Sequence, residues 1–430
     1  MKYDNYIPLK NKPDASETSF WINFTAFIVV LMTLLGLRFA GFKVTPYMFL
    51  IMAAVLTFTI VVLEKIFYPQ TNFYRRWRIR RKVNWIHIFY KEITLLLTLG
   101  VIGFLYWLFP MYSYDDFTLR YFPFLRIFVP ILLLGSIPYF CLMDKIDDEP
   151  EDVYYKIGYA IIHRQKTLSR FELGNYARSW LVKGFWLSLM QPYMMTDINW
   201  LFNLVWENIK NKPVEWFWFA NSFCFFIDLT FASVGYLMNF KLLNSQTRTA
   251  EPTLFGWMVA IMCYWPFWGI LFYQYFFRYE KIGWMSVFVT ESAWWWVWFI
   301  SIILLELLYA LATVAAGIRF SNLTYRGLWN TGPYKWSKHP AYVCKNISWW
   351  LIAMPFMINN TEEAIKACFM LIGVNVIYYL RAKTEERHLS HYPEYEEYAL
   401  KMNEKSIFTG VAKILPFLKY KPLKKEDRLF

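Results

Sequence analysis

The sequence predicts an all-α protein that crosses a membrane many times, a polytopic helical membrane protein. Two observations carry this prediction. Apolar residues make up 57% of the 430 residues and only 18% are charged, and the apolar residues gather in long runs separated by polar loops. A bilayer core requires about 20 apolar residues per helix, and a helix satisfies the backbone polar groups that lipid cannot. We therefore expect about ten transmembrane segments, each of roughly that length.

The expected segments follow one another along the whole chain. In order, they are residues 20–41, 46–65, 86–109, 122–142, 180–205, 215–239, 254–277, 294–317, 346–358 and 364–380. It is open whether the fifth segment crosses the membrane. Gln191-Pro192 interrupts this segment, and proline removes a helix hydrogen bond. The last two are short. They indicate a tight helical hairpin or a shallow re-entrant pair, which protein must cover at membrane depth.

Basic residues predict the orientation of the chain. The loop after the second segment contains Arg75, Arg76, Arg78, Arg80, Arg81 and Lys82. Loops rich in Lys and Arg stay in the cytoplasm, so counting outward places both termini there, together with loops 143–179, 240–253 and 318–345. The net charge of +13 lies largely beside apolar spans. It therefore does not indicate binding to nucleic acid.

We expect two parts in the chain. Residues 1–290 form an N-terminal transmembrane bundle whose role the sequence leaves open. Residues 291–430 carry two polar clusters that flank the apolar hairpin. If the hairpin dips into the membrane and returns, both clusters meet at the cytoplasmic surface.

The two clusters differ in local structure. The first, residues 332–342 (GPYKWSKHPAY), is turn-like, because Pro340 bars a regular helix through His339. The second, residues 381–386 (RAKTEE), has helical spacing. Arg381 and Glu385 are four residues apart and share a face, whereas Glu386 points elsewhere.

Neither cluster is specific by itself. A histidine before proline is usually structural, and an Arg–Glu pair beyond a membrane helix is often an exposed ion pair with a snorkelling arginine. Ionisable residues inside spans are candidates for function or for pairing within the bundle; here they are Glu92, Arg126, Asp228 and Glu306. Glu306 lies in the span that leads to the first cluster, so we expect it at the entrance to a site formed by the two clusters.

Together, the pattern G-P-Y-x-x-x-x-H-P-x-Y, an apolar hairpin and R-x-x-x-E-E resembles the isoprenylcysteine carboxyl methyltransferase family. The resemblance runs roughly from residue 320 to residue 410 and includes Tyr395-Glu396-Glu397-Tyr398. It implies a cytoplasmic pocket for S-adenosylmethionine. It also implies methyl transfer to a lipidic or prenylated acceptor, such as a prenylcysteine carboxylate.

The resemblance implies roles for particular residues. Arg381 and Glu385 would be catalytic residues. Arg381 and Glu306 would face the substrate. The cofactor would be bound by backbone groups of Arg326, Gly327, Leu328 and Trp329 and by Tyr334, His339, Pro340, Ala341, Tyr342, Glu385 and Glu386. The chain departs from the family at Arg319, where an amide side chain is usual, and at Val343-Cys344, where a glycine often follows the tyrosine.

The expected chemistry requires no metal. Methyl transfer from a sulfonium is an in-line displacement, and a carboxylate nucleophile needs desolvation and alignment rather than a general base. The guanidinium of Arg381 matches a carboxylate, and the rings of Tyr334, Trp336 and Tyr342 favour a cationic sulfonium. The expected partners are a lipid or prenylated substrate and membrane lipids, not nucleic acid.

Two other functions remain open. NADPH-dependent sterol or lipid reductases share a related C-terminal fold, but their tail typically has an Arg-Asp pair, a Cys and a Lys-Tyr-Gly-x-x-Trp pattern. Here the equivalent stretch is Glu385-Glu386-Arg387-His388. A non-catalytic lipid-binding protein would also fit the upstream spans. The sequence leaves open the methyl acceptor, the oligomeric state and the cellular membrane.

Overall fold

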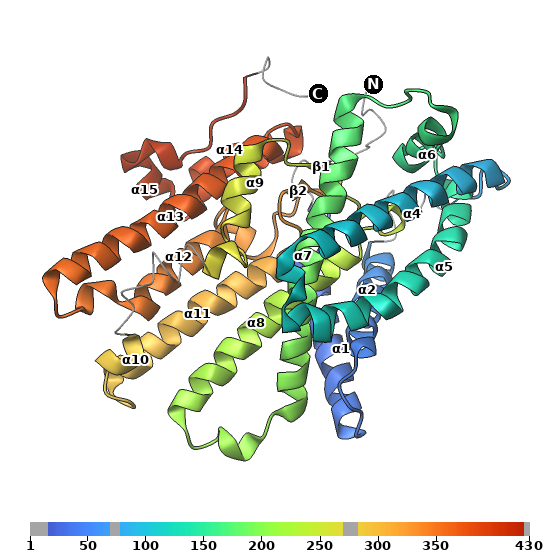
Figure 1. Cartoon of the computed structure of the whole chain (residues 1–430). Helices are drawn as coiled ribbons and strands as arrows, with labels where there is room; N and C mark the ends of the chain where they lie inside the picture. The colour runs from blue at the N-terminus through green and yellow to red at the C-terminus, as the bar shows by residue number, and fades with distance from the viewer. Residues whose placement is uncertain (1–15, 69–77, 270–282, 425–430) are drawn as a thin grey trace.

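The computed structural model describes residues 16–68, 78–269 and 283–424 and is almost entirely helical (Figure 1). Within these ranges, seven helices are long and apolar enough to cross a membrane. They are α1 (Phe20–Phe39), α2 (Pro46–Phe67), α4 (Trp85–Leu108), α5 (Phe122–Ile146) with the preceding turn η2 (Phe117–Tyr121), α8 (Pro213–Leu237), α11 (Ala293–Ala316) and α13 (Thr361–Leu389). The fold class predicted from the sequence is confirmed.

The remaining elements are shorter or more polar. The helices are α6 (Val153–His163), α7 (Arg170–Asn203), α9 (Leu254–Ile261), α10 (Trp284–Val287), α12 (Pro340–Ala353), α14 (Pro393–Lys405) and α15 (Thr409–Ile414). Two short strands, β1 (Thr249–Ala250) and β2 (Thr324–Tyr325), pair antiparallel. The polar clusters lie on and around α12 and α13.

Three expected segments differ from the observed helices. Residues 180–203 of the segment 180–205 lie in α7, a 34-residue helix that continues through Pro192 and is not among the candidate membrane helices. The segment expected at 254–277 begins as α9, which ends at Ile261, and residues 270–277 lie outside the described ranges. The segment 346–358 is mostly in α12, whose 14 residues are too few for a bilayer core.

The helical hairpin before the second cluster is confirmed, although its second arm is longer than expected. The helix α13 has 29 residues, so it extends the apolar run 364–380 through residues 381–386. The side chain of Asn360 accepts a hydrogen bond from the backbone of Glu363 and caps the start of this helix. Pro340 occupies the first turn of α12, where its missing N–H costs nothing.

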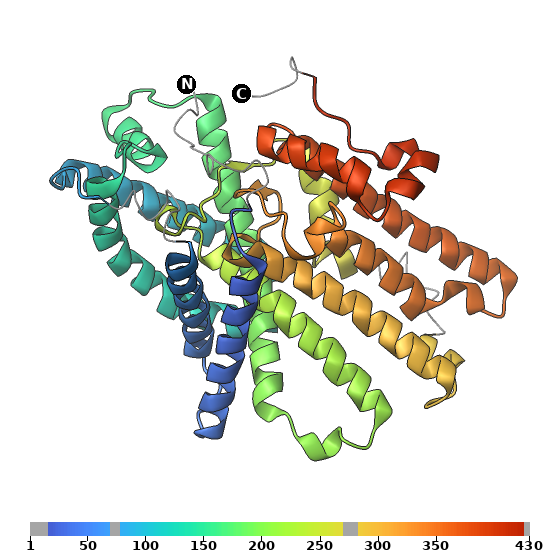
Figure 2. The same cartoon turned by 180° about the vertical axis from the view of Figure 1, so that it is seen from behind.

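The helix α11 joins the N-terminal bundle to the hairpin. It packs against α8 on one side and against α12 on the other, as both views of the fold show (Figure 2). The main apolar core contains residues of α1, α2, α7, α8 and α11, including the fully buried Trp186 and Phe231. The site residues on α12 and α13 are therefore carried on a scaffold shared with the upstream bundle.

The loops expected on one side of the membrane meet at one end of the molecule. Lys241 pairs with Asp147 at 2.5 Å, which joins loops 240–253 and 143–179. The guanidinium of Arg326 donates to the carbonyl of Ser245 at 2.5 Å, which joins loop 318–345 to them. The common end agrees with the predicted topology, and its assignment to the cytoplasm stays a prediction. The predicted orientation was based on the basic loop after the second segment. Two of its residues, Arg75 and Arg76, lie outside the described residues.

Candidate functional site

The hairpin of α12 and α13 brings the two polar clusters into contact. The hydroxyl of Tyr342, in the first turn of α12, donates to Oε2 of Glu385 on α13 at 2.8 Å. One position further along α13, Oε1 of Glu386 lies 2.7 Å from Nζ of Lys338. Residues that are more than forty positions apart therefore form one site, as the paired motifs predicted.

Glu385 is the accessible carboxylate of this site. Its side chain is 40% exposed, in contrast to Glu386 at 7%. The imidazole of His339 stacks on the ring of Tyr342, with centroids 5.5 Å apart and planes 4° from parallel. The Nδ1 atom of His339 is 3.9 Å from Glu385. The carboxylate thus stands beside two flat rings and can accept hydrogen bonds from a ligand.

Glu386 faces different partners, as its helical position predicted. Its carboxylate contacts Lys338 at 2.7 Å, Lys383 at 2.8 Å and Nε2 of His339 at 3.3 Å. Burial lowers the pKa of Lys338, and the Glu386 carboxylate opposes this shift. These partners tie the first cluster to α13, so Glu386 acts in the structure as an anchor for the loop.

Arg381 is buried in an aromatic cage. Its guanidinium carbon lies 5.0 Å from the ring centroid of Tyr342, 5.4 Å from that of Tyr264 and 5.9 Å from that of Tyr378. One of its nitrogens donates to Oδ1 of Asn322 at 2.5 Å. Within the described part of the chain, no carboxylate pairs with Arg381, so the exposed ion pair with Glu385 does not form.

The loop of residues 326–329 is held tightly by its neighbours. The buried side chain of Arg326 donates to backbone carbonyls; its acceptors are Ser245 (2.5 Å), Gly235 (2.8 Å), Phe320 (2.9 Å) and Met238 (3.3 Å). Gly327 has a φ of 109°, which favours glycine. The carbonyl of Leu328 accepts from the backbone N–H of Glu17 at 2.8 Å, so this particular backbone group is already occupied.

The remaining donor-site candidates surround the start of α12. Pro340 and Ala341 form its first turn, and His339 precedes it. The ring of Trp329 lies edge-on to that of Tyr334, with centroids 6.5 Å apart. The carbonyl of Tyr334 accepts from the hydroxyl of Tyr398 at 2.7 Å, which connects the first cluster to α14. Burial, reinforced by the charge of Glu385, raises the pKa of Tyr334, so its phenol stays neutral.

Residues 296–391 match the model of the isoprenylcysteine carboxyl methyltransferase (ICMT) family. The resemblance predicted from the two motifs is confirmed for this region. The match includes both clusters and the hairpin between them, and it supports a membrane methyltransferase. No curated protein and no solved structure matches the chain.

The family-matched region makes contacts that the sequence did not predict. Asn322 and Tyr264 contact Arg381 from 59 and 117 residues away. The ammonium of Lys345 lies over the ring of Tyr309, 4.4 Å from its centroid. Lys345 stands directly before the apolar run 346–358, and a cation at that position could have marked it as a candidate. Nothing in the local pattern marks Asn322.

Three of the four ionisable residues inside spans, Asp228, Glu306 and Glu92, accept hydrogen bonds within the bundle. Asp228 on α8 accepts from Tyr309 at 2.6 Å and from Thr313, both on α11. Glu306 on α11 accepts from Asn221 at 2.7 Å, and Glu92 accepts from Ser136 at 2.9 Å. The predicted place of Glu306 at the substrate entrance stays a prediction.

Arg319, at the position where the resemblance implied an amide side chain, is buried. Its Nε donates to the carbonyl of Asn244 at 3.1 Å, and its guanidinium lies 3.7 Å from Glu64. These contacts hold the loop after α11, which is a structural role. In ranges 16–68, 78–269 and 283–424, no group of three or more His, Cys, Asp or Glu residues is arranged to hold a metal ion.

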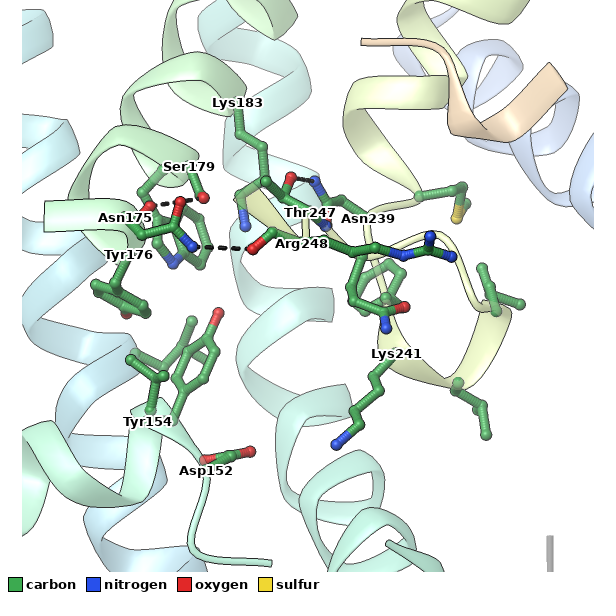
Figure 3. A pocket seen from close by; sticks show the side chains of 18 of the residues that line it. Asp152, Tyr154, Asn175, Tyr176, Ser179, Lys183, Asn239, Lys241, Thr247 and Arg248 are labelled. Carbon is green, nitrogen blue, oxygen red and sulfur yellow. Dashed lines mark hydrogen bonds between the residues drawn. The ribbon is translucent and has the colours of Figure 1, made fainter. Parts of the chain in front are cut away.

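A separate cavity of about 2880 Å³ lies between α4, α5, α7 and residues 237–248 (Figure 3). Among the donor-site candidates, Leu328 lines it, whereas Tyr334, Tyr342 and Glu385 do not. Its wall also includes Tyr392 and Glu394, which follow α13. The cavity therefore adjoins the family-matched region without being the site built from the two motifs.

Proposed function

We propose that the protein is a membrane-embedded methyltransferase that uses S-adenosylmethionine and acts on a lipidic or prenylated acceptor. In this proposal, residues 291–430 are the transferase domain, and the donor site faces the cytoplasm. The observation that carries it is the contact of Tyr342 with Glu385 beside the caged Arg381, within the region that matches the methyltransferase family.

The residues around Glu385 fit the methyl donor. An exposed carboxylate can accept hydrogen bonds from the amino or hydroxyl groups of the donor. The rings of Tyr342 and Tyr334 and the exposed Trp336 offer aromatic faces to a sulfonium. When bound, S-adenosylmethionine supplies an electrophilic methyl group. Glu385, Tyr342 and His339 would hold and orient it at the mouth of the hairpin.

Arg381 fits an anionic acceptor. The guanidinium is buried, lies over aromatic rings and has no carboxylate partner among the described residues. A carboxylate of the acceptor would supply the missing charge through a two-pronged contact. Such an interaction would align the nucleophile and exclude water from it, which are the two requirements of this displacement. The prenylcysteine carboxylate is the acceptor that we favour.

Ligand binding by the full-length protein in lipid nanodiscs tests this proposal. We expect labelled S-adenosylmethionine to bind and its methyl group to pass to a farnesylcysteine analogue. Glu385→Gln should weaken donor binding, whereas Glu363→Gln, at the far end of the same helix, should not. Binding of NADPH without binding of S-adenosylmethionine would contradict the proposal. Transfer to a phospholipid amine in place of the farnesylcysteine analogue would contradict the favoured acceptor.

A further inference from the structure

The C-terminal segment, residues 405–424, combines exposed apolar side chains with basic ones. It includes α15 and lies beyond residues 296–391, which match the family model. Ile414 is 79% exposed, Ile407 68% and Phe417 54%. No Asp or Glu occurs in residues 405–424, whereas five lysines do: Lys405, Lys413, Lys419, Lys421 and Lys424. Such a surface fits a partner that is both apolar and negatively charged.

Contacts with α13 and α14 hold the C-terminal segment in place. The hydroxyl of Tyr420 lies 2.7 Å from that of Ser390, directly after α13. The side chain of Asn403 on α14 accepts from the backbone N–H of Tyr420 and donates to its carbonyl, both at 2.9 Å. The ammonium of Lys383 on α13 donates to the carbonyl of Lys419 at 3.1 Å. The exposed side chains of the segment therefore form one defined surface beside α13.

This surface meets α13 at the end of its apolar run. The ring of Phe417 lies edge-on to that of Tyr379, with centroids 5.6 Å apart, and the hydroxyl of Tyr379 donates to the carbonyl of Phe417. Tyr379 is the next-to-last residue of the run 364–380, and the basic Arg381 and Lys383 follow it. In a membrane helix, tyrosine and basic residues at the end of an apolar run mark the headgroup level. The C-terminal segment thus lies at the depth of the membrane surface.

The exposed face of α13 leads to the same place. Four exposed apolar side chains recur on this helix at spacings of four and three residues: Ile365, Phe369, Ile372 and Val376. Tyr379 continues the series, and Phe417 covers it. Because α13 is a candidate membrane helix, this face fits contact with acyl chains. Both views place α15 at the outer edge of the molecule, away from α1 and α2 (Figure 1, Figure 2).

We propose that the C-terminal segment docks on the surface of an anionic membrane. Ile407, Ile414 and Phe417 enter the boundary between headgroups and acyl chains, and the lysines contact the negatively charged headgroups. A second copy of this chain is a poorer occupant, because a two-fold contact would bring the lysines of both segments together. The argument uses no donor or acceptor residue, so this proposal and the proposed methyl transfer can fail independently.

Photo-crosslinking of the full-length protein tests the docking. The protein is reconstituted in nanodiscs of equal parts phosphatidylcholine and phosphatidylserine, with p-benzoylphenylalanine in place of Ile414. Mass spectrometry then identifies the adducts. We expect lipid adducts at this position and few at the control position Glu397, which is exposed on α14. Equal lipid labelling at the two positions, or adducts of Ile414→p-benzoylphenylalanine to a second copy of the chain alone, would overturn the proposal.

The lipid composition of the adducts tests the charge preference. We expect phosphatidylserine to exceed phosphatidylcholine among the adducts about fivefold, the effect of roughly one lysine at an anionic surface. The paired change Lys413→Gln and Lys421→Gln should remove most of this excess. The control is Lys210→Gln with Lys212→Gln, which removes two exposed cations from the loop between α7 and α8. No excess in the unaltered segment, or an excess that survives the first pair of changes, would overturn the preference for anionic lipid.

Discussion

The hydroxyl of Tyr342 donates to Oε2 of Glu385 at 2.8 Å, across 43 residues of sequence. The ring of the same tyrosine lies 5.0 Å from the guanidinium carbon of Arg381. One side chain of α12 therefore touches both members of the helical pair on α13. In the proposed function, Glu385 serves the donor and Arg381 serves the acceptor, so Tyr342 stands where the two must meet.

Replacement of Tyr342 by phenylalanine should weaken donor binding and leave the fold intact. The change removes the hydrogen bond to Glu385 but keeps the ring beside Arg381 and His339. A hydrogen bond contributes about 0.5–1.5 kcal/mol, so we expect a loss of roughly threefold to tenfold in affinity for S-adenosylmethionine. Equilibrium binding of labelled donor measures it.

The control for this variant is Tyr379→Phe. Tyr379 is also on α13, and its hydroxyl donates to the carbonyl of Phe417 at 3.1 Å, away from Glu385. We expect its affinity for the donor to match that of the unaltered protein. Equal donor affinities of the unaltered protein, Tyr342→Phe and Tyr379→Phe would show that the hydroxyl of Tyr342 has no part in donor binding.

Replacement of Arg381 by alanine should abolish methyl transfer while donor affinity stays within about tenfold, or 1.4 kcal/mol. In the proposed function, the guanidinium binds the acceptor, whereas Glu385 and Tyr342 bind the donor. Arg381→Lys keeps the charge but loses the fork that matches a carboxylate, so its kcat/KM should also fall. Steady-state kinetics and donor binding on the same preparations separate the two effects.

Arg387→Lys is the matched control for the acceptor role. Arg387 is on the same helix, is 41% exposed and pairs with Glu251 at 2.9 Å, a contact that a lysine can keep. We expect its rate of transfer to stay close to that of the unaltered protein. Because Arg381 is buried, the melting temperature of each variant must also be measured. Full turnover by Arg381→Ala would exclude the substrate role.

Replacement of Arg326 by lysine should destabilise the protein. The planar guanidinium donates to four carbonyls at once, and a lysine ammonium cannot span them. Each lost hydrogen bond from a charged group costs about 1.5–3 kcal/mol when its partner stays buried. A lower melting temperature in detergent would report the loss. The control is Arg170→Lys, at the exposed start of α7, which should leave the melting temperature unchanged.

Replacement of Gly158 by alanine should loosen α6 from α4. A Cβ at this position would lie 2.1 Å from the backbone oxygen of Tyr90, so the two helices would have to separate. Crowding of this kind costs typically 1–3 kcal/mol. We expect faster proteolysis of α6 and a lower melting temperature. Gly410→Ala, which meets open space in α15, should show neither change.

The sequence by itself determined the features that depend on local composition and period. The apolar runs predicted membrane helices because a bilayer sets their length. The spacing of Arg381, Glu385 and Glu386 predicted that the first two share a helix face and that the third points elsewhere. The contacts of the first two with Tyr342 and of the third with Lys338 agree with this prediction. The hairpin, flanked by two motifs, predicted their contact and the family that the region resembles.

Only the tertiary structure decided which distant groups complete the site. The cage around Arg381 includes Tyr264 and Asn322, and their positions depend on how α13 rotates against loops that are remote in sequence. The cavity that contains Lys183 arises from the separation of α4, α5 and α7, which no single helix encodes. Helical period is a property of each segment, whereas contacts between segments follow from the packing of the whole chain. This is why the sequence predicted the contact between the two motifs and left the cage around Arg381 and the cavity to the fold.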